Sequence, residues 1–391
     1  MSDPFAVAAT VRLKPGRDAS LGRRHPWIYR GALADEVPAG TAPLRVVAAD
    51  GRPLGTALPG SSGGSLALRM VAWGDERWGA ALLRARLERA LALRLRLAID
   101  SDALRLVHAE GDGLPGLVVD RYADVAVIET YEAAWQPLLD ELAGFLLGPG
   151  GCTTVLARSG AGTAPAEALR GAAPAGPETI REGLLRFPVD LVGGQKTGFF
   201  LDQRDNRRRV GELARGCTVL NLFSYSGGFA VAALAGGARR AVNVDASRSA
   251  LELARAAYRL NGLIVADDDF VRGDAFTVAR DLAAAGARFD LVVVDPPAFV
   301  RRRGEQRRGL GGYRDVNLQA LRLLAPGGLL LTCSCSALVD EEGLRGALLA
   351  ASLDAGREIQ LLEARGAAPD HPVALACPET RHLKALLCRV P

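Results

Sequence analysis

Short apolar runs alternate with segments of helical spacing throughout the chain after about residue 187. Between the runs, apolar residues recur at intervals of three and four over 229–235, 248–260 and 276–285, the spacing of amphipathic helices. This alternation predicts a doubly wound α/β domain with a mostly parallel sheet over residues 188–391. The apolar runs lie at residues 219–223, 241–245, 270–274, 291–295 and 329–333, with a late one at 383–389.

The part of the chain before residue 188 has a different pattern. Residues 1–75 are rich in glycine, proline and short β-prone runs, which indicates a small, mostly β domain. Over residues 76–99 leucine and alanine recur with helical spacing, with arginines on the other face, and a central α+β domain is predicted over 76–187. The remaining predicted elements are strands at 43–49, 65–71, 117–122, 125–128 and 153–158, a helix at 135–147 and a low-complexity loop at 160–176.

Composition limits the class of protein. A chain of 391 residues is too long for one typical core. It has no uninterrupted apolar stretch of about 18 residues and no signal-peptide pattern at its start, so neither a membrane span nor secretion is expected. Its six cysteines are scattered and lack CxxC spacing, which favours reduced thiols in the cytoplasm over a disulfide framework or a metal site.

Basic residues gather in two clusters, although the net charge is only +4. The first cluster has His25, Trp27 and Tyr29 interleaved, so charges for phosphates lie beside rings that could stack on bases. The alternative is a solvated face with Trp27 in a small core. The second cluster follows residue 300 and is a candidate for holding a nucleic-acid backbone, or else a solvated loop. The clusters are Arg12, Lys14, Arg17, Arg23, Arg24 and Arg30, and then Arg301, Arg302, Arg303, Arg307 and Arg308.

The turn after the first strand of the α/β domain is a candidate cofactor site. It contains Phe223, Ser224, Tyr225, Ser226 and Gly227. The turn lacks the first two glycines of GxGxxG, so it is a poor fit to a pyrophosphate and favours a cofactor without one.

Two acids at the next strand ends extend this candidate site. Asp245 has the offset of an acid that accepts hydrogen bonds from ribose hydroxyls, and Asp274 could reach an adenine amino group. These positions favour S-adenosylmethionine over NAD. The alternative is an ordinary α/β domain with acids in its loops.

Two motifs at neighbouring strand ends carry the candidate chemistry. Asp295, followed by Pro296 and Pro297, could accept a hydrogen bond from the amino group of a base, or could take a proton. A thiolate that adds to C6 of a pyrimidine makes C5 able to accept a methyl group. Cys333 and Cys335 both fit this role, and strand alternation places them on one side, so periodicity does not separate them.

Two other functions compete with this interpretation. Methylation of a base nitrogen would use Asp295 as an acceptor and Phe299 as a stacking ring, and needs no cysteine. A ribosome-associated RNA-binding protein with a vestigial methyltransferase fold would need neither the acids nor the thiol.

Motifs along essentially the whole chain resemble those of bacterial 23S ribosomal RNA cytosine-C5 methyltransferases that carry an N-terminal PUA domain. Two positions depart from that pattern: Ala298, where relatives often have lysine, and His382, where an aromatic residue is usual. The matching motifs lie at 14–16, 25–27, 111–116, 119–122, 194–204, 221–229, 295–299, 312–315, 334–336, 370–372, 378–379 and 383–384.

The resemblance implies a PUA domain over 1–75, a central domain over 76–187 and a class I methyltransferase domain over 188–391. It implies Cys335 rather than Cys333 as the nucleophile, because the family pattern is Ser-Cys-Ser, with Asp295 as its catalytic partner. It implies no metal and no membrane, 23S ribosomal RNA of the large subunit or its precursor as the partner, and leaves a homodimer open. The implied S-adenosylmethionine site is Phe223, Ser224, Tyr225, Ser226, Gly227, Asp245, Asp274, Asp295, Gln203 and Arg204, and the implied RNA contacts are Pro296, Pro297, Phe299, Arg23, Arg24, Arg301 and Arg302.

Overall fold

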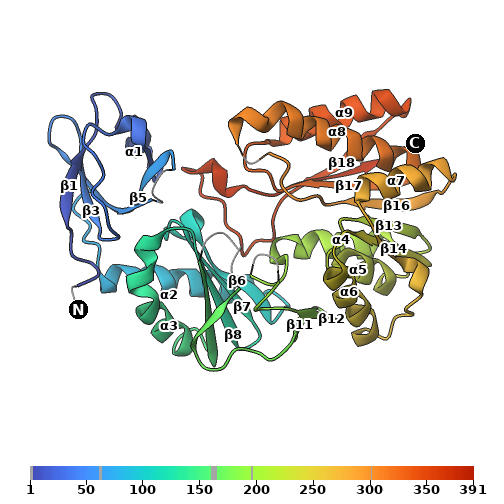
Figure 1. Ribbon diagram of the computed structural model, residues 1–391, viewed down its shortest axis with the longest axis horizontal. Helices are drawn as coiled ribbons and strands as arrows, with labels where there is room; N and C mark the ends of the chain where they lie inside the picture. The colour runs from blue at the N-terminus through green and yellow to red at the C-terminus, as the bar shows by residue number, and fades with distance from the viewer. Residues whose placement is uncertain (1–2, 61–63, 160–164, 195–196, 301) are drawn as a thin grey trace. The chain divides into compact units, whose positions relative to one another are not determined.

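The computed structural model describes residues 3–60, 64–159, 165–194, 197–300 and 302–391, and its backbone forms two compact units (Figure 1). The first unit comprises Met1–Glu178, Val189–Leu201 and Pro369–Thr380, and the second comprises Thr179–Pro188, Asp202–Ala368 and Arg381–Pro391. Within the described ranges no helix is long and apolar enough to cross a membrane.

The first unit opens with a strongly curved β-sheet whose strand order, over the described residues, is β1-β3-β4-β5-β2. Strands β3 and β5 fall on the predicted β-prone runs, and their alternate residues fill a core that includes Val46, Leu68 and Met70. The mostly β character predicted for this part is confirmed. The elements are β1 (Ala9–Arg12), α1 (Ala19–Gly22), β2 (Trp27–Tyr29), η1 (Arg30–Ala32), β3 (Leu44–Val47), β4 (Pro53–Pro59) and β5 (Leu66–Trp73).

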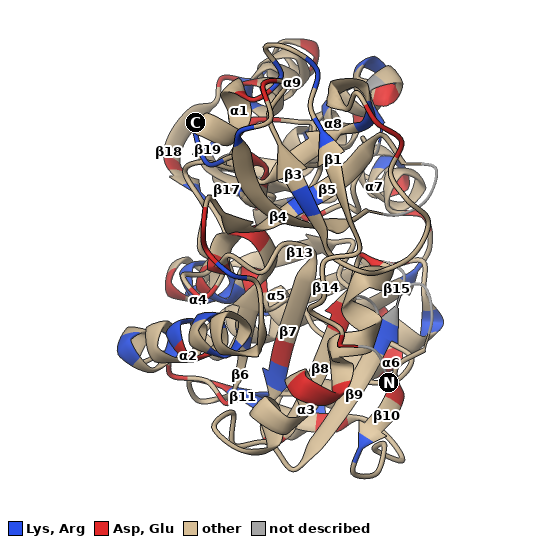
Figure 2. Ribbon diagram, turned by 90° about the vertical axis from the view of Figure 1, so that its left-hand side faces the viewer, with Lys and Arg blue, Asp and Glu red and all other residues tan. Residues whose placement is uncertain are grey.

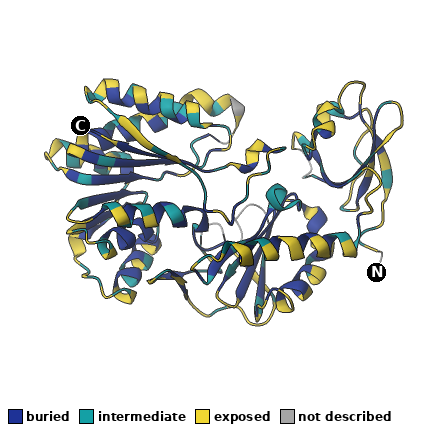
Figure 3. Cartoon of the chain, turned by 180° about the vertical axis from the view of Figure 1, so that it is seen from behind, coloured by how far each residue is buried: buried dark blue, intermediate teal, exposed yellow. Residues whose placement is uncertain are grey.

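A second sheet in the first unit has the order β10-β9-β8-β7-β6 over the described residues. Helix α2 (Ala80–Leu97) buries Leu83, Leu87 and Ala90 in the core it shares with this sheet, and its other face is exposed (Figure 3). The arginines of α2 mark the helix in Figure 2. The remaining elements are β6 (Ala103–His108), η2 (Ala109–Asp112), β7 (Leu117–Tyr122), β8 (Val125–Thr130), η3 (Ala133–Leu138), α3 (Leu139–Leu147), β9 (Thr154–Ser159), β10 (Glu167–Arg170) and η7 (Pro378–Thr380).

The helix expected over 135–147 is present, as the 3-10 helix η3 followed directly by α3. One sequence prediction for this region was wrong. The loop expected over 160–176 contains strand β10. This strand pairs with β9 at the edge of the sheet and is mostly exposed, so it has no apolar pattern from which it could be predicted.

The second unit is built on a sheet with the order β15-β14-β13-β16-β17-β19-β18 over the described residues, which confirms the predicted doubly wound α/β domain. Strands β13 to β17 are parallel, while β19 runs antiparallel to both β17 and β18. The strands are β13 (Thr218–Leu222), β14 (Arg240–Asp245), β15 (Phe270–Arg272), β16 (Phe289–Val294), β17 (Leu324–Ser334), β18 (Gln360–Arg365) and β19 (Lys384–Arg389), with a separate pair, β11 (Glu178–Glu182) and β12 (Leu185–Val189).

Helices cover both faces of this sheet: α4, α5 and α6 lie on one side, and α7, α8 and α9 on the other (Figure 1). The central strands are buried on both faces, which explains their continuous apolar runs. Strand β18 was not predicted, because it is an edge strand with exposed side chains. The helical elements are η4 (Leu201–Gln203), α4 (Arg204–Leu213), α5 (Gly228–Ala235), α6 (Arg248–Leu260), η5 (Asp267–Asp269), α7 (Ala275–Ala284), η6 (Arg303–Glu305), α8 (Gln306–Leu323) and α9 (Glu341–Ala355).

Candidate active site

The predicted motifs of the second unit meet at one edge of its sheet. The register pairs Leu222 with both Val244 and Val294, and Val294 with Thr332. The parallel strands β13, β14, β16 and β17 therefore end at the same level, and the residues that follow them share the carboxyl-terminal edge. In open α/β sheets this edge is where ligands bind.

The turn between β13 and α5 is held in an unusual backbone conformation. Phe223, Tyr225 and Gly227 all have positive φ angles, of 59°, 45° and 75°. The Asp245 carboxylate stabilises this turn, because Oδ2 accepts a hydrogen bond from the Tyr225 N–H at 2.8 Å and Oδ1 accepts one from the Ser247 N–H at 2.8 Å. A side chain at Gly227 would also place its Cβ 2.9 Å from that of Ala254. The glycine is therefore required both by its φ and by close packing.

Buried polar atoms beside this turn fit a nucleoside that carries an amino-acid group. Ser224 Oγ and Asn221 Oδ1 are buried and have no hydrogen-bond partner among the described residues. Buried polar atoms rarely stay unpaired, so a ligand with hydroxyl, amine or carboxylate groups would satisfy them. Phe223 and Phe276 add an apolar wall, with ring centroids 6.0 Å apart. The residues present therefore fit S-adenosylmethionine.

Three other residues predicted for the cofactor site make contacts within the protein. Asp274 is exposed and caps α7, where Oδ1 accepts a hydrogen bond from the Thr277 N–H at 3.0 Å. Gln203 and Arg204 are buried where η4 passes into α4, and Gln203 Oε1 accepts a hydrogen bond from Asn206 Nδ2 at 2.6 Å. Their cofactor contacts stay a prediction.

The two candidate thiols differ sharply in environment. Cys333 lies inside β17 and is fully buried. Burial, and then the charge of Asp295, raise the pKa of the Cys333 thiol well above its ordinary value, which opposes thiolate formation. Cys335 lies just beyond the end of β17, is half-buried, and has its Sγ 3.8 Å from the carbonyl oxygen of Pro296. The structure thus brings Cys335 beside the loop that follows Asp295.

Tyr313 on α8 fixes the loop that carries Cys335. Its hydroxyl accepts a hydrogen bond from Ser334 Oγ at 2.8 Å and pairs with Ser336 Oγ at 2.9 Å. Ser336 Oγ also accepts a hydrogen bond from the Val300 N–H at 3.1 Å. The serines on both sides of Cys335 are therefore turned toward the fully buried Tyr313. Sequence reasoning listed Tyr313 in a motif but assigned it no role, because its partners lie far away in the chain.

The loop from Pro297 to Val300 packs directly on α8. A Cβ at Gly309 would lie 2.2 Å from Val300 Cγ2, and one at Gly312 would lie 3.2 Å from the Phe299 ring. The glycines of α8 thus allow the helix to approach the loop closely. Phe299 packs between the rings of Phe276, at 5.8 Å, and Tyr313, at 4.8 Å, and its contact with a substrate stays a prediction.

The second basic cluster is partly helical. Arg302 is exposed, and Arg307 and Arg308 are exposed in the first turn of α8, where a loop was expected. Arg301 lies outside the described residues. Cations at a helix N-terminus are unfavourable with respect to the helix dipole, and phosphate binding at this turn stays a prediction.

The first basic cluster is exposed on the first unit, and of its interleaved rings Tyr29 is exposed while His25 and Trp27 are half-buried. Trp27 Nε1 donates a hydrogen bond to Glu110 Oε1 at 2.7 Å, and the Arg69 guanidinium lies 5.4 Å from the Trp27 ring centroid. Trp27 is half-buried between charged partners and is not among the described residues of the apolar core, and a stacking role stays a prediction. Arg23 and Arg24 are exposed.

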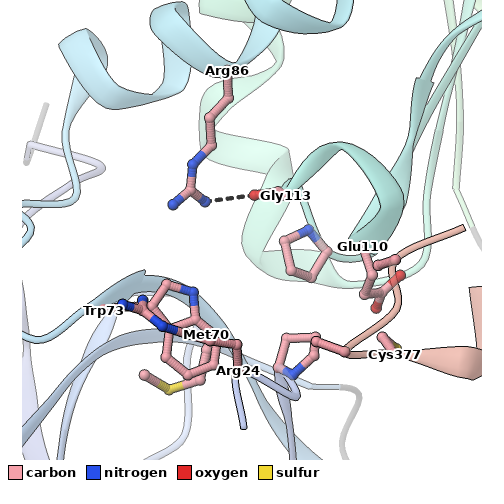
Figure 4. A pocket seen from close by; sticks show the side chains of 11 residues that line it. Arg24, Met70, Trp73, Arg86, Glu110, Gly113 and Cys377 are labelled. Atoms are coloured by element: carbon pink, nitrogen blue, oxygen red, sulfur yellow. Dashed lines mark hydrogen bonds between the residues drawn. The ribbon is translucent and has the colours of Figure 1, made fainter. Parts of the chain in front are cut away.

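A small cavity of about 80 Å³ lies next to this cluster (Figure 4). The Arg24 guanidinium lies 5.2 Å from the centroid of the Trp73 ring at its wall. Across the cavity Arg86 Nη1 donates a hydrogen bond to the Gly113 carbonyl at 2.5 Å. Arg24 is thus a cation held over an aromatic face, in a backbone conformation with φ of 65°.

Beside the cavity, His25, Cys377 and Glu379 bring one potential metal ligand each to within 4.8 Å of one another. His25 Nδ1 accepts the Trp27 N–H at 3.2 Å, so Nε2 carries the ring proton and faces Glu379 Oε2 at 3.3 Å. Cys377 Sγ lies 3.5 Å from the same oxygen. A metal at Nε2 would have to displace that proton, so the trio fits a hydrogen-bonded set better than a metal site.

Two further motifs of the sequence meet in the first unit. Thr197 Oγ1 donates a hydrogen bond to Asp120 Oδ2 at 2.5 Å and pairs with the Tyr122 hydroxyl at 2.8 Å. Arg105 binds both oxygens of Asp120 at 2.8 Å. These contacts give the motifs at 119–122 and 194–204 a structural role, although Gln195 and Lys196 lie outside the described residues.

Comparison with known proteins gives two family matches. A family model of S-adenosylmethionine-dependent methyltransferases matches residues 151–389, and one of PUA-like domains matches residues 11–73. Proteins named ribosomal RNA large subunit methyltransferase I from Shewanella denitrificans and Aeromonas salmonicida are each 38% identical, over 401 and 400 residues, covering 98% of this chain and 100% of each relative.

Solved structures share the fold. A candidate S-adenosylmethionine-dependent methyltransferase from Streptococcus mutans superposes with a TM-score of 0.87 at 21% identity, covering 98% of this chain and 100% of that one. A candidate methyltransferase complexed with SAH superposes with a TM-score of 0.87 at 20% identity and the same coverage.

Proposed function

The chain belongs to the S-adenosylmethionine-dependent methyltransferases that carry a PUA-like domain, and from this premise we propose that it methylates C5 of a cytosine in 23S ribosomal RNA. The substrate class comes from the relatives, which are named for methylation of large-subunit ribosomal RNA. The choice of carbon over nitrogen comes from this chain's own residues.

One observation carries that choice: Cys335 lies half-buried, 3.8 Å from the Pro296 carbonyl, next to the loop that begins at Asp295. Transfer of a methyl group to a base nitrogen needs an acceptor for the amino group and a stacking ring, but no thiol. Cys333 is a weak rival, because it is fully buried and its thiol pKa is raised.

The proposed reaction begins when the Cys335 thiolate adds to C6 of the cytosine, which forms a carbon–sulfur bond and gives C5 the character of an enamine. S-adenosylmethionine supplies the electrophilic methyl group that C5 takes. A base then removes the proton from C5, and the electron pair of that C–H bond forms the C5–C6 double bond as the thiolate leaves.

Asp295 is proposed to hold the cytosine. Its carboxylate would accept a hydrogen bond from the N4 amino group, which orients the ring beside Cys335. Pro296 and Pro297 restrict the backbone of this loop, since each fixes its own φ, and Phe299 closes the site with its ring. The role of Asp295 as the proton acceptor stays an alternative.

Basic residues are proposed to bind the RNA backbone. Arg23 and Arg24 on the first unit and Arg302 on the second are exposed, as phosphate contacts require. Arg301 is kept as a proposed contact on the resemblance alone.

Methyl transfer to ribosomal RNA by Cys335→Ala tests the proposal. We expect methyl transfer to fall by at least 1,000-fold, on the order of the loss of a covalent nucleophile, while Cys333→Ala keeps most of the activity. Mass spectrometry of nucleosides should find 5-methylcytosine, and RNA with 5-fluorocytosine should trap a covalent adduct in the parent protein but not in Cys335→Ala.

Retained activity in Cys335→Ala, with a base methylated on nitrogen, would instead support the rival enzyme reaction. If the parent protein showed neither methyl transfer nor S-adenosylmethionine binding, the result would favour a non-catalytic RNA-binding protein.

A further inference from the structure

Lys384 is a buried cation at the end of the sheet that carries Cys335. It is the first residue of β19 and pairs in register with Ser334 of β17, and the residue is only 3% exposed. Its Nζ donates hydrogen bonds to the carbonyl oxygens of Ser336, at 2.7 Å, and of His382, at 2.9 Å. The ammonium is therefore hydrogen-bonded to Ser336, the residue that directly follows the proposed nucleophile Cys335.

Binding two carbonyl groups with a buried ammonium carries a large desolvation cost, because burial in an apolar environment opposes the charge. The pKa of Lys384 is lowered to about 8, mainly by burial and also by the charge of Arg381, while the charges of Cys335 and Asp340 offset part of this effect. A neutral donor would bind the same carbonyls without this cost. The charge is explained if a partner anion forms beside it, and the Cys335 thiolate is such an anion.

Tyr313, whose hydroxyl binds both serines of this loop, does not supply a positive charge. The Tyr313 hydroxyl is neutral at ordinary pH, and burial raises its pKa. Asp295 and Asp202 raise the pKa of the adjacent Cys333, so they oppose a thiolate in this region. Lys384 is a cation with a direct hydrogen bond to the 334–336 loop.

We propose that Lys384 is a positioning residue for the reaction: its ammonium anchors the loop that follows Cys335 and stabilises that cysteine as a thiolate. The inference rests on the proposed function in one respect, that the thiolate is the attacking group. A cation near a thiol lowers the thiol pKa and so raises the fraction of nucleophile at neutral pH.

Alkylation of Cys335 by iodoacetamide as a function of pH tests this in the full chain, without RNA or S-adenosylmethionine. The rate in Cys335→Ala is subtracted as background. We expect the midpoint of the alkylation rate against pH to lie below the ordinary cysteine pKa of about 8.5 in the parent protein. In Lys384→Met this midpoint should rise by about one pH unit or more. We also expect kcat for methyl transfer to fall at least tenfold in Lys384→Met, with little change in the KM for RNA.

Tyr313→Phe is the matched control. It removes the hydroxyl that contacts both serines but leaves the Lys384 charge in place, so it should lower kcat without moving the alkylation midpoint. Thermal melting of each variant establishes that it is folded. A parent midpoint at or above about 8.5 overturns the proposal even if Lys384→Met does not fold. An unmoved midpoint in folded Lys384→Met, or an equal shift in Tyr313→Phe, also overturns it.

The two proposals fail separately. Retained methyl transfer by Cys335→Ala would refute the thiol mechanism whatever the alkylation midpoint, because the midpoint reports only on the Lys384–Cys335 pair. An unmoved midpoint together with complete loss of activity in Cys335→Ala would refute the role of Lys384 and leave the nucleophile intact.

Discussion

Substitution of Gly309 by alanine tests whether the close approach of α8 holds the loop from Pro297 to Val300 in place. The new Cβ would lie 2.2 Å from Val300 Cγ2 and 2.9 Å from the Phe299 carbonyl oxygen. Ordinary carbon contacts start near 3.5 Å, so the loop or the helix must move by about 1 Å. Rotation of Val300 could relieve the first contact but not the second, which is with backbone.

Gly311 provides a control in the same helix, because an added Cβ there would meet nothing within 4 Å. Alanine in place of glycine in a helix gains about 1 kcal/mol, so Gly311→Ala should stabilise the protein slightly. In Gly309→Ala the same gain is opposed by an overpacking cost of about 1–3 kcal/mol. The clash with backbone oxygen favours the upper end, and we expect a net loss of about 1–2 kcal/mol.

Methyl-transfer activity should also respond to the displacement of this loop in Gly309→Ala. Val300 donates its N–H to Ser336 Oγ, so movement of the loop is transmitted to the residue beside Cys335. Thermal or urea unfolding should show stability changes of opposite sign for the two variants, and methyl transfer should fall about tenfold or more in Gly309→Ala only. The reasoning is refuted if Gly309→Ala is as stable and as active as Gly311→Ala.

Three further predictions concern charged groups. The pKa of Lys384 is about 8 in the folded chain and 10.5 in the unfolded chain, so between these values the unfolded chain binds more protons and the free energy of unfolding should rise with pH, by about 3 kcal/mol in total. Urea unfolding at pH 7.5 to 10.5 should show no such rise in Lys384→Met, and equal slopes of stability against pH in the two proteins would contradict the assignment. Asp245→Asn weakens the acceptor of two backbone N–H groups, so calorimetry should show S-adenosylmethionine binding at least tenfold weaker, and unchanged affinity would argue against this site. Arg69→Met leaves the buried carboxylates of Glu110 and Glu132 without their cation and should destabilise the protein by about 3–5 kcal/mol in unfolding experiments. A loss of stability below about 1 kcal/mol would contradict this expectation.

The architecture of the second unit was predictable from sequence because its signals are local. Buried parallel strands require continuous apolar runs, and the helices between them require spacing of three and four, so each element shows its type within its own residues. The acids and the thiol follow the strands directly, and parallel strands bring those ends to one edge. Strands β10 and β18 escaped prediction, because an exposed edge strand is held by backbone hydrogen bonds and needs no apolar pattern.

The tertiary structure decided what periodicity left open. Cys333 and Cys335 have equivalent places in the alternation, and their difference in burial arises from the helices and loops packed around the end of β17. The contacts of Ser336 with Tyr313 and Lys384 span 23 and 48 residues of the chain. A hydrogen bond or a burial that depends on distant segments leaves no mark on the local pattern, so the sequence alone determined the fold and the set of candidate reactive groups, and packing determined which of the two thiols is fully buried and which is half-exposed.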